Sequence, residues 1–309
     1  MGDIMNEKTG GVSINLDYYG GADLYCDGPV EEEILEIVKT RDKSEFDNII
    51  KESGKWEYLY HLSELRKNCV EWLPLDKSMS VLEIGSGCGA LTGAFAKNAG
   101  SVKCIELSKK RTLINAYRNK EYDNIEIMVG NFQDIAEHIE EKFDIVTLIG
   151  VLEYSESYIK AENPFVEMLK KSGSFLKEGG TLAVAIENRL GMKYWAGCKE
   201  DHVRLYYESI EGYTKSSGVK TFGRKELADL CTLAGFTNIK FYYPYPDYKF
   251  ADTIYSDDYL PKAGELGNNM RNFDDSRLIT LDEGKAFDSV IKNGLFAQYA
   301  NSFLVLLEK

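Results

Sequence analysis

Long apolar runs are missing from this sequence of 309 residues. No stretch of about 18 consecutive apolar residues occurs, so we expect no membrane-spanning helix. The segment Met1–Thr9 has neither a basic start nor an apolar core, so it does not match a secretory signal. Internal repeats and low-complexity tracts are also absent. With 44% hydrophobic residues, the chain suits one large α/β domain with attachments or two small domains.

Cysteine pairs are missing and histidines are scarce. The six cysteines, at positions 26, 69, 88, 104, 198 and 231, form no C-x-x-C pair, so we expect no zinc site and no other metal site. We interpret all six as reduced thiols, which favours a cytoplasmic protein. The three histidines are His61, His138 and His202, and we expect a structural or solvated role for the first two.

Positive charge is in deficit. The sequence has 37 Lys and Arg against 50 Asp and Glu, which gives a formal net charge of −13. Proteins that bind the phosphate backbone of nucleic acids usually carry clustered basic residues. The charge balance therefore argues against broad nucleic-acid binding, and we expect no nucleic-acid partner.

One short stretch combines an apolar run, an acid and closely spaced glycines. The run Ser80–Ile84 is followed by a glycine at every second position and then by an amphipathic segment, 91–97. This order predicts strand, tight loop and helix, with backbone N–H groups of the loop and helix facing a ligand. A second strand ends in an acid at a distance suited to ribose hydroxyls. The candidate cofactor-binding residues here are Glu83, Gly85, Ser86, Gly87, Gly89, Glu106 and Leu107.

Charge distinguishes between two classes of ligand for this loop. The spacing Gly85-x-Gly87-x-x-Ala90 also fits a loose dinucleotide pattern, but Glu83 would repel a pyrophosphate. S-adenosylmethionine carries a sulfonium, an ammonium and a carboxylate, so Glu83 suits its net positive charge. The order E-x-G-x-G-x-G resembles the first motif of class I S-adenosylmethionine-dependent methyltransferases. This resemblance implies S-adenosyl-L-methionine as the cofactor.

Strand and helix patterns alternate regularly from residue 80 onward. Such alternation predicts an α/β, Rossmann-like fold with a mostly parallel sheet and helices on both faces. We expect seven strands, at 80–84, 101–105, 125–129, 143–149, 180–186, 239–243 and 302–307. We expect the intervening helices at about 90–98, 109–119, 133–140, 162–176 and 222–234.

The segments outside this alternation suggest a cap and lids. Residues 1–76 are expected to form an N-terminal segment, irregular over 1–29, and a helical cap with helices at 30–39, 44–50 and 56–72. The methyltransferase domain is expected to span 77–309. Two long connections within it, about 188–220 and 247–300, are expected to act as lids over the pocket.

The ends of the third and fourth strands provide further candidates, because ligands of open α/β sheets lie at the carboxyl ends of the strands. The class I resemblance implies that Asn131 and Phe132 receive the adenine, with ordinary core packing as the alternative for Phe132. It also places Gly150 beside the methionine part of the cofactor. The candidates after Gly150 are Val151 for the cofactor and Glu153 and Tyr154 for the substrate.

The stretch after the fifth strand, 187–202, ends in an acid, an acid and a histidine. Its polar and aromatic residues suit a substrate wall, with Asn188, Tyr194 and Trp195 as substrate-binding candidates. Packing of the insertion is the alternative for the two aromatics. For the acid that opens the stretch, the alternative is a salt bridge to Arg189 or Lys193.

The chain is also similar to a narrower group of bacterial methyltransferases, found with glycosyltransferases and surface-polysaccharide assembly. The resemblance covers nearly the whole chain and includes the motifs 187–197, 200–202, 212–213, 221–224 and 241–249. It implies a sugar, a glycan or another small molecule as acceptor, without naming it. The sequence leaves the oligomeric state open, a homodimer included.

Methyl transfer to a sugar hydroxyl needs a group that takes the hydroxyl proton. His202 is our first candidate because imidazole titrates near neutrality, and Glu187 and Asp201 are the next. Our first hypothesis is therefore O-methylation of a sugar or glycan intermediate. The alternatives are an O- or N-methyltransferase of secondary metabolism and a non-catalytic, cofactor-binding partner subunit. RNA methylation is the weakest hypothesis because of the acidic charge.

Overall fold

A computed structural model describes residues 6–23, 25–267, 269 and 275–309. The chain divides into two compact units. The N-terminal unit comprises residues 1–148 and 175–180, and the C-terminal unit comprises residues 149–174 and 181–309. Each is described below by itself.

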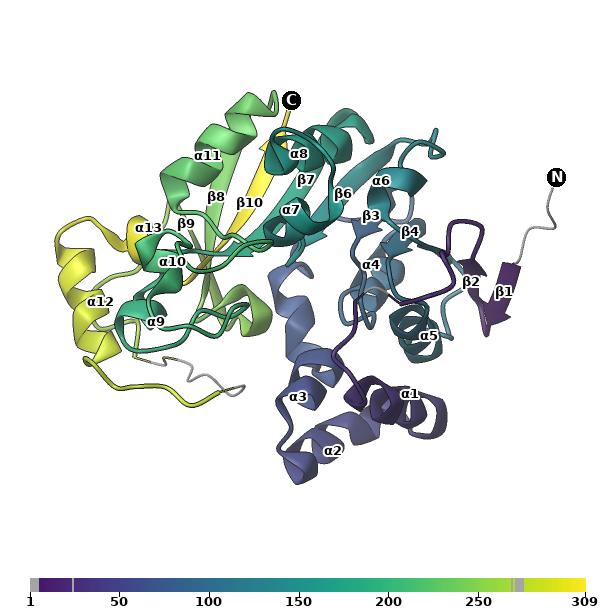
Figure 1. The fold of residues 1–309 in the computed structure, drawn as a ribbon, viewed down its shortest axis with the longest axis horizontal. Helices are drawn as coiled ribbons and strands as arrows, with labels where there is room; N and C mark the ends of the chain where they lie inside the picture. Colours follow the sequence, from purple (N-terminus) through teal and green to yellow (C-terminus); the bar gives the residue numbers. More distant parts are fainter. Residues whose placement is uncertain (1–5, 24, 268, 270–274) are drawn as a thin grey trace. The chain divides into compact units, whose positions relative to one another are not determined.

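The N-terminal unit contains a sheet with the strand order β1-β2-β5-β4-β3-β6 (Figure 1). β1 and β2 form an antiparallel hairpin, and the following neighbours pair in parallel. The strands are β1 (Asn6–Thr9), β2 (Val12–Asn15), β3 (Ser80–Ile84), β4 (Ser101–Glu106), β5 (Ile125–Val129) and β6 (Phe143–Ile149), whose last residue belongs to the C-terminal unit. The central strands are apolar runs because helices cover parallel sheets on both faces.

Among the described residues of this unit, three α-helices precede β3, and the other three each follow one of the strands β3, β4 and β5. They are α1 (Val30–Thr40), α2 (Phe46–Ser53), α3 (Trp56–Leu62), α4 (Thr92–Asn98), α5 (Lys109–Arg118) and α6 (Phe132–Ile135). Two 3₁₀ helices span Lys43–Glu45 and Glu64–Cys69. Ser108 caps α5 by accepting a hydrogen bond from the Arg111 N–H at 3.2 Å.

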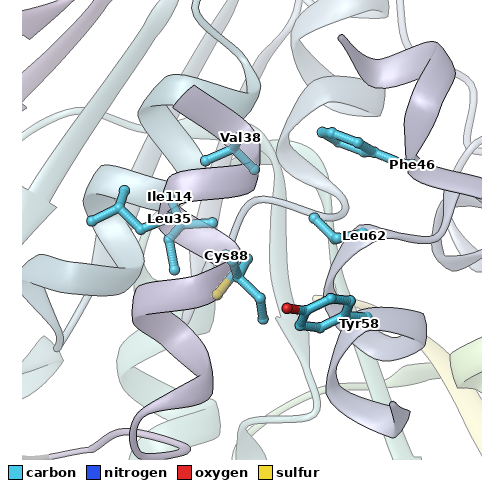
Figure 2. Close-up of a cluster of buried hydrophobic side chains, with 8 residues drawn as sticks. Leu35, Val38, Phe46, Tyr58, Leu62, Cys88 and Ile114 are labelled. Carbon is cyan, nitrogen blue, oxygen red and sulfur yellow. The ribbon is translucent and has the colours of Figure 1, made fainter. Parts of the chain in front are cut away.

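The helices α1 to α3 pack on α5 and on the glycine loop that follows β3, through one apolar cluster (Figure 2). Its buried members are Ile34, Leu35, Val38, Phe46, Tyr58, Leu62, Cys88 and Ile114. Cys88 comes from the glycine loop and Ile114 from α5, so the same apolar contacts that fold the N-terminal helices also support the loop.

The C-terminal unit contains the strand order β7-β10-β8-β9, and its described pairings are antiparallel. The strands are β7 (Leu176–Glu187), whose residues 176–180 belong to the N-terminal unit, β8 (Asn238–Tyr245), β9 (Thr253–Ser256) and β10 (Ser302–Glu308). The helices are α7 (Ser155–Tyr158), α8 (Pro164–Ser174), α9 (Met192–Trp195), α10 (Glu208–Glu211), α11 (Arg224–Leu233), α12 (Glu283–Lys292) and α13 (Phe296–Tyr299). Short 3₁₀ helices span Leu152–Tyr154 and Tyr248–Phe250.

The predicted fold class is confirmed, and the predicted number of strands is wrong. The described residues form ten strands where the pattern predicts seven. The segment 1–29, which we expected to be irregular, contains the β1–β2 hairpin, and Gly10 and Gly11 form its two-residue turn. β9 lies inside the segment that we expect to be a lid. The predicted helix 56–72 ends at Leu62, and the chain continues as a 3₁₀ helix beyond Ser63.

None of the helices in the described ranges combines the length and apolar character that a membrane crossing needs.

Candidate functional site

The glycine loop between β3 and α4 has the shape that its sequence predicts. Gly87 has φ +52°, and a Cβ atom added there would meet open space. Gly89 has φ +76°, and an added Cβ atom would collide with the Asn115 side chain. Gly87 therefore leaves room for a ligand to approach the backbone, whereas Gly89 allows close packing against α5.

Glu106 holds the glycine loop through its carboxylate. Its Oε2 atom accepts a hydrogen bond from the Gly87 N–H at 2.7 Å, and its Oε1 atom accepts one from the Ser108 N–H at 3.0 Å. Burial raises the pKa of Glu106 above its ordinary value, and nearby Arg111 offsets only part of this rise. The carboxylate is thus oriented by backbone donors, and its remaining lone pairs suit the ribose hydroxyls of the expected cofactor.

Glu83 lies at the end of a chain of side-chain hydrogen bonds. Asn119 donates to Asn115 at 2.8 Å, Asn115 donates to Thr92 at 3.0 Å, and the Thr92 hydroxyl donates to Glu83 at 2.6 Å. Burial raises the pKa of Glu83 to about 7. The chain ties α4 and α5 to the acid of the motif, so its position is fixed before any ligand binds.

The remaining cofactor candidates of this unit have mixed surroundings. Ser86 Oγ is buried and has no hydrogen-bond partner among the described residues, which fits a polar ligand at the loop. Leu107 is half-buried. Asn131 caps α6 by accepting from the Gln133 N–H at 2.8 Å. The Phe132 ring is buried and meets Phe175 edge-on, with centroids 6.3 Å apart, as ordinary core packing would require.

The segment that precedes α1 contributes polar contacts that sequence reasoning missed. Asp23 accepts hydrogen bonds from the N–H groups of Lys109 and Lys110 at the start of α5, at 2.7 and 3.2 Å. Asp27 lies 2.8 Å from His61 Nε2 and 2.7 Å from an Arg111 nitrogen. His61 is therefore structural, as predicted, and burial lowers its pKa despite the Asp27 contact. The acids within this aromatic, glycine-rich segment are the sequence signal that could have indicated these contacts.

The predicted catalytic residues of the C-terminal unit gather in one group, which we call the buried charge cluster. It consists of Glu153, Glu187, Lys193, Asp201, His202, Asp247 and Lys249. Glu153 belongs to the 3₁₀ helix after β6, and Glu187 ends β7. The other members come from three separate stretches of the chain, which is why no local sequence pattern reveals the whole set.

His202 contributes the imidazole of this cluster. Its Nδ1 atom is 3.0 Å from the Tyr154 hydroxyl, and its Nε2 atom is 3.4 Å from Glu187 Oε2. Burial disfavours the charged imidazole, but the neighbouring Glu187 outweighs it and raises the pKa of His202 to about 9. This corrects the expectation of a histidine that titrates near neutrality, because nearby carboxylates stabilise the imidazolium.

The two glutamates of the cluster differ in charge. Burial raises the pKa of Glu153 to about 8, and the charge of Glu187 adds to the effect. Burial acts on Glu187 too, yet Lys249 and His202 hold the pKa of that carboxyl well below its usual range. Glu187 is thus the ionised member of the pair at neutral pH. Its ionic partner is Lys249 rather than the Arg189 or Lys193 that we considered from sequence.

Two lysines and two aspartates balance one another beside the glutamates. Lys193 contacts Asp201 at 2.7 Å and Asp247 at 2.9 Å, and Lys249 contacts Asp201 at 2.6 Å. The Asp201 side chain is 13% exposed; burial raises its pKa, but these lysines outweigh that effect and lower the pKa below its ordinary value. Asp201 is therefore a weaker base than sequence reasoning supposes. Asp247 and Lys249 were missed as site residues, although their motif contributed to the family resemblance.

The other predicted site residues of the C-terminal unit differ in their contacts and burial. Gly150 donates its N–H to Ala185 O at 2.9 Å, and Val151 is half-buried. The Asn188 amide donates to the carbonyls of Gln298 and Ala300 at 2.8 and 2.7 Å, so it holds two chain segments together. Tyr194 is fully buried, which matches packing of the insertion.

Trp195 differs from Tyr194, which precedes it in α9. Its side chain is 39% exposed, and its indole N–H donates to Leu190 O at 3.2 Å. Of the two aromatic candidates, Trp195 therefore offers the surface that a substrate contact needs.

Comparisons with known proteins identify relatives of this chain. A family model described as "Methyltransferase domain" matches residues 56–240. The ubiquinone biosynthesis O-methyltransferase of Coxiella burnetii is 28% identical over 140 residues, 44% of this chain and 56% of that protein. The ribosomal RNA small subunit methyltransferase A of Streptococcus gordonii is 32% identical over 81 residues, 26% of this chain and 28% of that protein. The chain thus spans about half, or less, of the length of these curated relatives.

Among solved structures, a SAM-dependent methyltransferase from Thermotoga maritima is 18% identical to this chain. The alignment covers 85% of this chain and 97% of that one, with a TM-score of 0.46.

Proposed function

This chain belongs to the class I S-adenosylmethionine-dependent methyltransferases, with S-adenosyl-L-methionine as its cofactor, and we propose that it methylates a hydroxyl group of a sugar or glycan intermediate. The narrower resemblance to methyltransferases of polysaccharide assembly supports this choice of acceptor. The residues proposed to bind the cofactor are Glu83, Gly85, Ser86, Gly87, Gly89, Glu106, Leu107, Asn131, Phe132, Gly150 and Val151.

The buried charge cluster is the observation that supports a hydroxyl acceptor. A hydroxyl oxygen becomes a good nucleophile only as its proton is lost, whereas a neutral amine already carries a reactive lone pair. The cluster places an ionised carboxylate, Glu187, 3.4 Å from the His202 imidazole, with Glu153 beside them. Such a set is suited to orienting a hydroxyl and stabilising the loss of its proton.

We assign the acceptor hydroxyl to this cluster. The cofactor supplies the methyl group on its sulfonium when bound. Glu187 and His202 bind and orient the hydroxyl, and Asp201 contacts Lys249, which holds the Glu187 carboxylate. Transfer further requires the acceptor oxygen within about 3 Å of the methyl carbon and the exclusion of water. Tyr154 and Trp195 are proposed acceptor contacts.

A small phenolic or alcoholic metabolite is the second candidate acceptor. The relatives include proteins named ubiquinone biosynthesis O-methyltransferase, and these are O-methyltransferases by name. The relatives named for ribosomal RNA favour an RNA acceptor, but the net charge of −13 speaks against one.

The test measures transfer of a labelled methyl group from S-adenosylmethionine. Four acceptor pools are offered separately: nucleotide sugars and oligosaccharides, phenols, amines, and RNA. We expect transfer to a hydroxyl of the first pool, located by mass spectrometry. Transfer to amines alone would contradict the proposal, and transfer to phenols alone would establish the second candidate.

A further inference from the structure

We propose that Glu153, Glu187 and His202 bind a divalent cation, a proposal that rests on the assignment of the acceptor hydroxyl to their cluster. Glu153, Glu187 and His202 each direct one ligand atom into a space where these atoms lie within 4.8 Å of one another. Glu153 Oε2, Glu187 Oε2 and His202 Nε2 have no hydrogen-bond partner in the part of the chain that the structure describes. Buried polar atoms normally have one, so three that face each other indicate a ligand.

The distances suit a cation of the size of a first-row transition metal. Two ligand atoms at about 2.1 Å from such an ion stand roughly 3.0–3.4 Å apart at octahedral or tetrahedral angles. His202 Nε2 and Glu187 Oε2 are 3.4 Å apart. The Glu153 carboxylate lies within 4.8 Å of both, so a small rotation of that side chain completes the set.

The neighbouring side chains leave the three ligand atoms available. The Tyr154 hydroxyl contacts Nδ1 of His202, which directs the other ring nitrogen toward the glutamates. Lys249 and Tyr248 contact Oε1 of Glu187, which leaves Oε2 facing His202. Metal-binding histidines generally engage a partner through the second ring nitrogen in this way.

Charge balance favours a divalent ion. Lys193 and Lys249 are matched by Asp201 and Asp247. As metal ligands the two glutamates are ionised and the imidazole is neutral, because a bound cation displaces protons from its ligands. The ligand set then carries two negative charges, which one divalent cation neutralises.

The donor set indicates which cations fit. Carboxylate oxygens alone suit Mg²⁺ and Ca²⁺, whereas an added imidazole favours Mn²⁺, Fe²⁺ or Zn²⁺. Three protein ligands leave coordination positions open, and we infer that the acceptor hydroxyl fills one of them. Contact with the cation lowers the pKa of a bound hydroxyl, which would promote its reaction.

The experiment uses the full chain, stripped with a chelator, and Mn²⁺ alone as the probe. Calorimetry and the electron paramagnetic resonance signal of free Mn²⁺ measure binding. We expect one Mn²⁺ per wild-type chain and a loss of affinity of about 100-fold or more in Glu153→Gln and His202→Gln. Tyr154→Phe, which removes only an outer partner, is expected to lose about 10-fold.

Matched controls are Glu156→Gln and His138→Gln, since both side chains are exposed. They are expected to bind Mn²⁺ like wild type. Thermal unfolding without cation verifies that each variant is folded. Absence of binding in wild type at about 1 mM Mn²⁺ and, separately, Zn²⁺ would overturn the proposal. So would equal affinities in wild type, Glu153→Gln and His202→Gln.

Turnover separates this proposal from the proposed function. If the stripped enzyme methylates a hydroxyl acceptor at the full rate, the cation proposal fails and the proposed function stands. If Mn²⁺ binds as described and only amines are methylated, the cation site stands and the proposed function fails.

Discussion

The glutamates of the two candidate sites are buried in opposite ways. In the N-terminal unit, Glu106 accepts two backbone hydrogen bonds and Glu83 accepts one from Thr92. In the C-terminal unit, Glu153 and Glu187 each keep an oxygen that has no hydrogen-bond donor among the described residues. The first arrangement holds a loop in shape with neutral donors. The second concentrates charge, and it is therefore the one suited to chemistry.

The largest effect is expected from a change of His202, the histidine of the buried charge cluster. His202→Ala removes the imidazole that contacts both Tyr154 and Glu187. Turnover should fall by roughly 10²–10⁴-fold, while cofactor affinity stays near the wild-type value. Steady-state kinetics and calorimetry with S-adenosylhomocysteine measure the two quantities, with His138→Ala as control. Unchanged specific activity together with a lower melting temperature would make His202 a structural residue.

The comparison also separates what sequence can predict from what it cannot. The glycine loop and Glu106 follow from a local pattern, because one strand, one turn and the next strand fix their geometry. The partners of Glu187 cannot be predicted from any local pattern. Lys249 is far from it in sequence, and only the fold of the C-terminal unit places the two in contact.

Two further differences between prediction and structure also arise because the local sequence pattern does not show them. The pattern for 56–72 is apolar enough for one long helix, and nothing in it shows that the chain turns at Ser63, where the hydroxyl accepts from the Leu65 N–H. The β1–β2 hairpin was missed because its strands are four residues each, too short for a periodicity to be recognised.

The second effect concerns the acid that holds the loop. Glu106→Ala removes the acceptor for the Gly87 and Ser108 N–H groups and the proposed ribose contact. The loss of two charge-assisted hydrogen bonds to the ribose hydroxyls, at about 1.5–3 kcal/mol each, corresponds to a fall in cofactor affinity of about two to four orders of magnitude. Calorimetry with S-adenosylhomocysteine measures it, and the exposed Glu137→Ala is the control. A folded variant with wild-type affinity would refute the ribose assignment.

The third effect is a pH dependence of stability from Glu83. Its pKa is about 7 in the folded chain and 4.5 as the reference, so the folded state binds more protons between these values. The free energy of unfolding therefore decreases as pH rises through this window, by on the order of 3 kcal/mol at most. Glu83→Gln should remove this part of the decrease while keeping an acceptor for Thr92.

Urea unfolding of the cofactor-free protein at pH 5.5 and 7.5 measures the difference between wild type and Glu83→Gln. The stability of the variant relative to wild type should be greater at the higher pH than at the lower one, because the Glu83 contribution is only partly lost by pH 5.5. Parallel pH profiles of the two proteins would show that Glu83 is already ionised, and that its hydrogen bonds outweigh its burial.

The smallest effect decides between two roles for Asn131. Its side chain caps α6, and an N-cap replaced by alanine costs about 1 kcal/mol of stability. If its oxygen also accepts from the adenine amino group, Asn131→Ala should lose a further 2–10-fold or so in cofactor affinity, the worth of one neutral hydrogen bond. Asn131→Asp retains an oxygen for both contacts, so it should restore both quantities. If Asn131→Ala loses stability and keeps full affinity, the residue is a helix cap alone. In that case the adenine pocket owes its selectivity to other groups, because the ordinary packing of Phe132 against Phe175 provides no hydrogen bond.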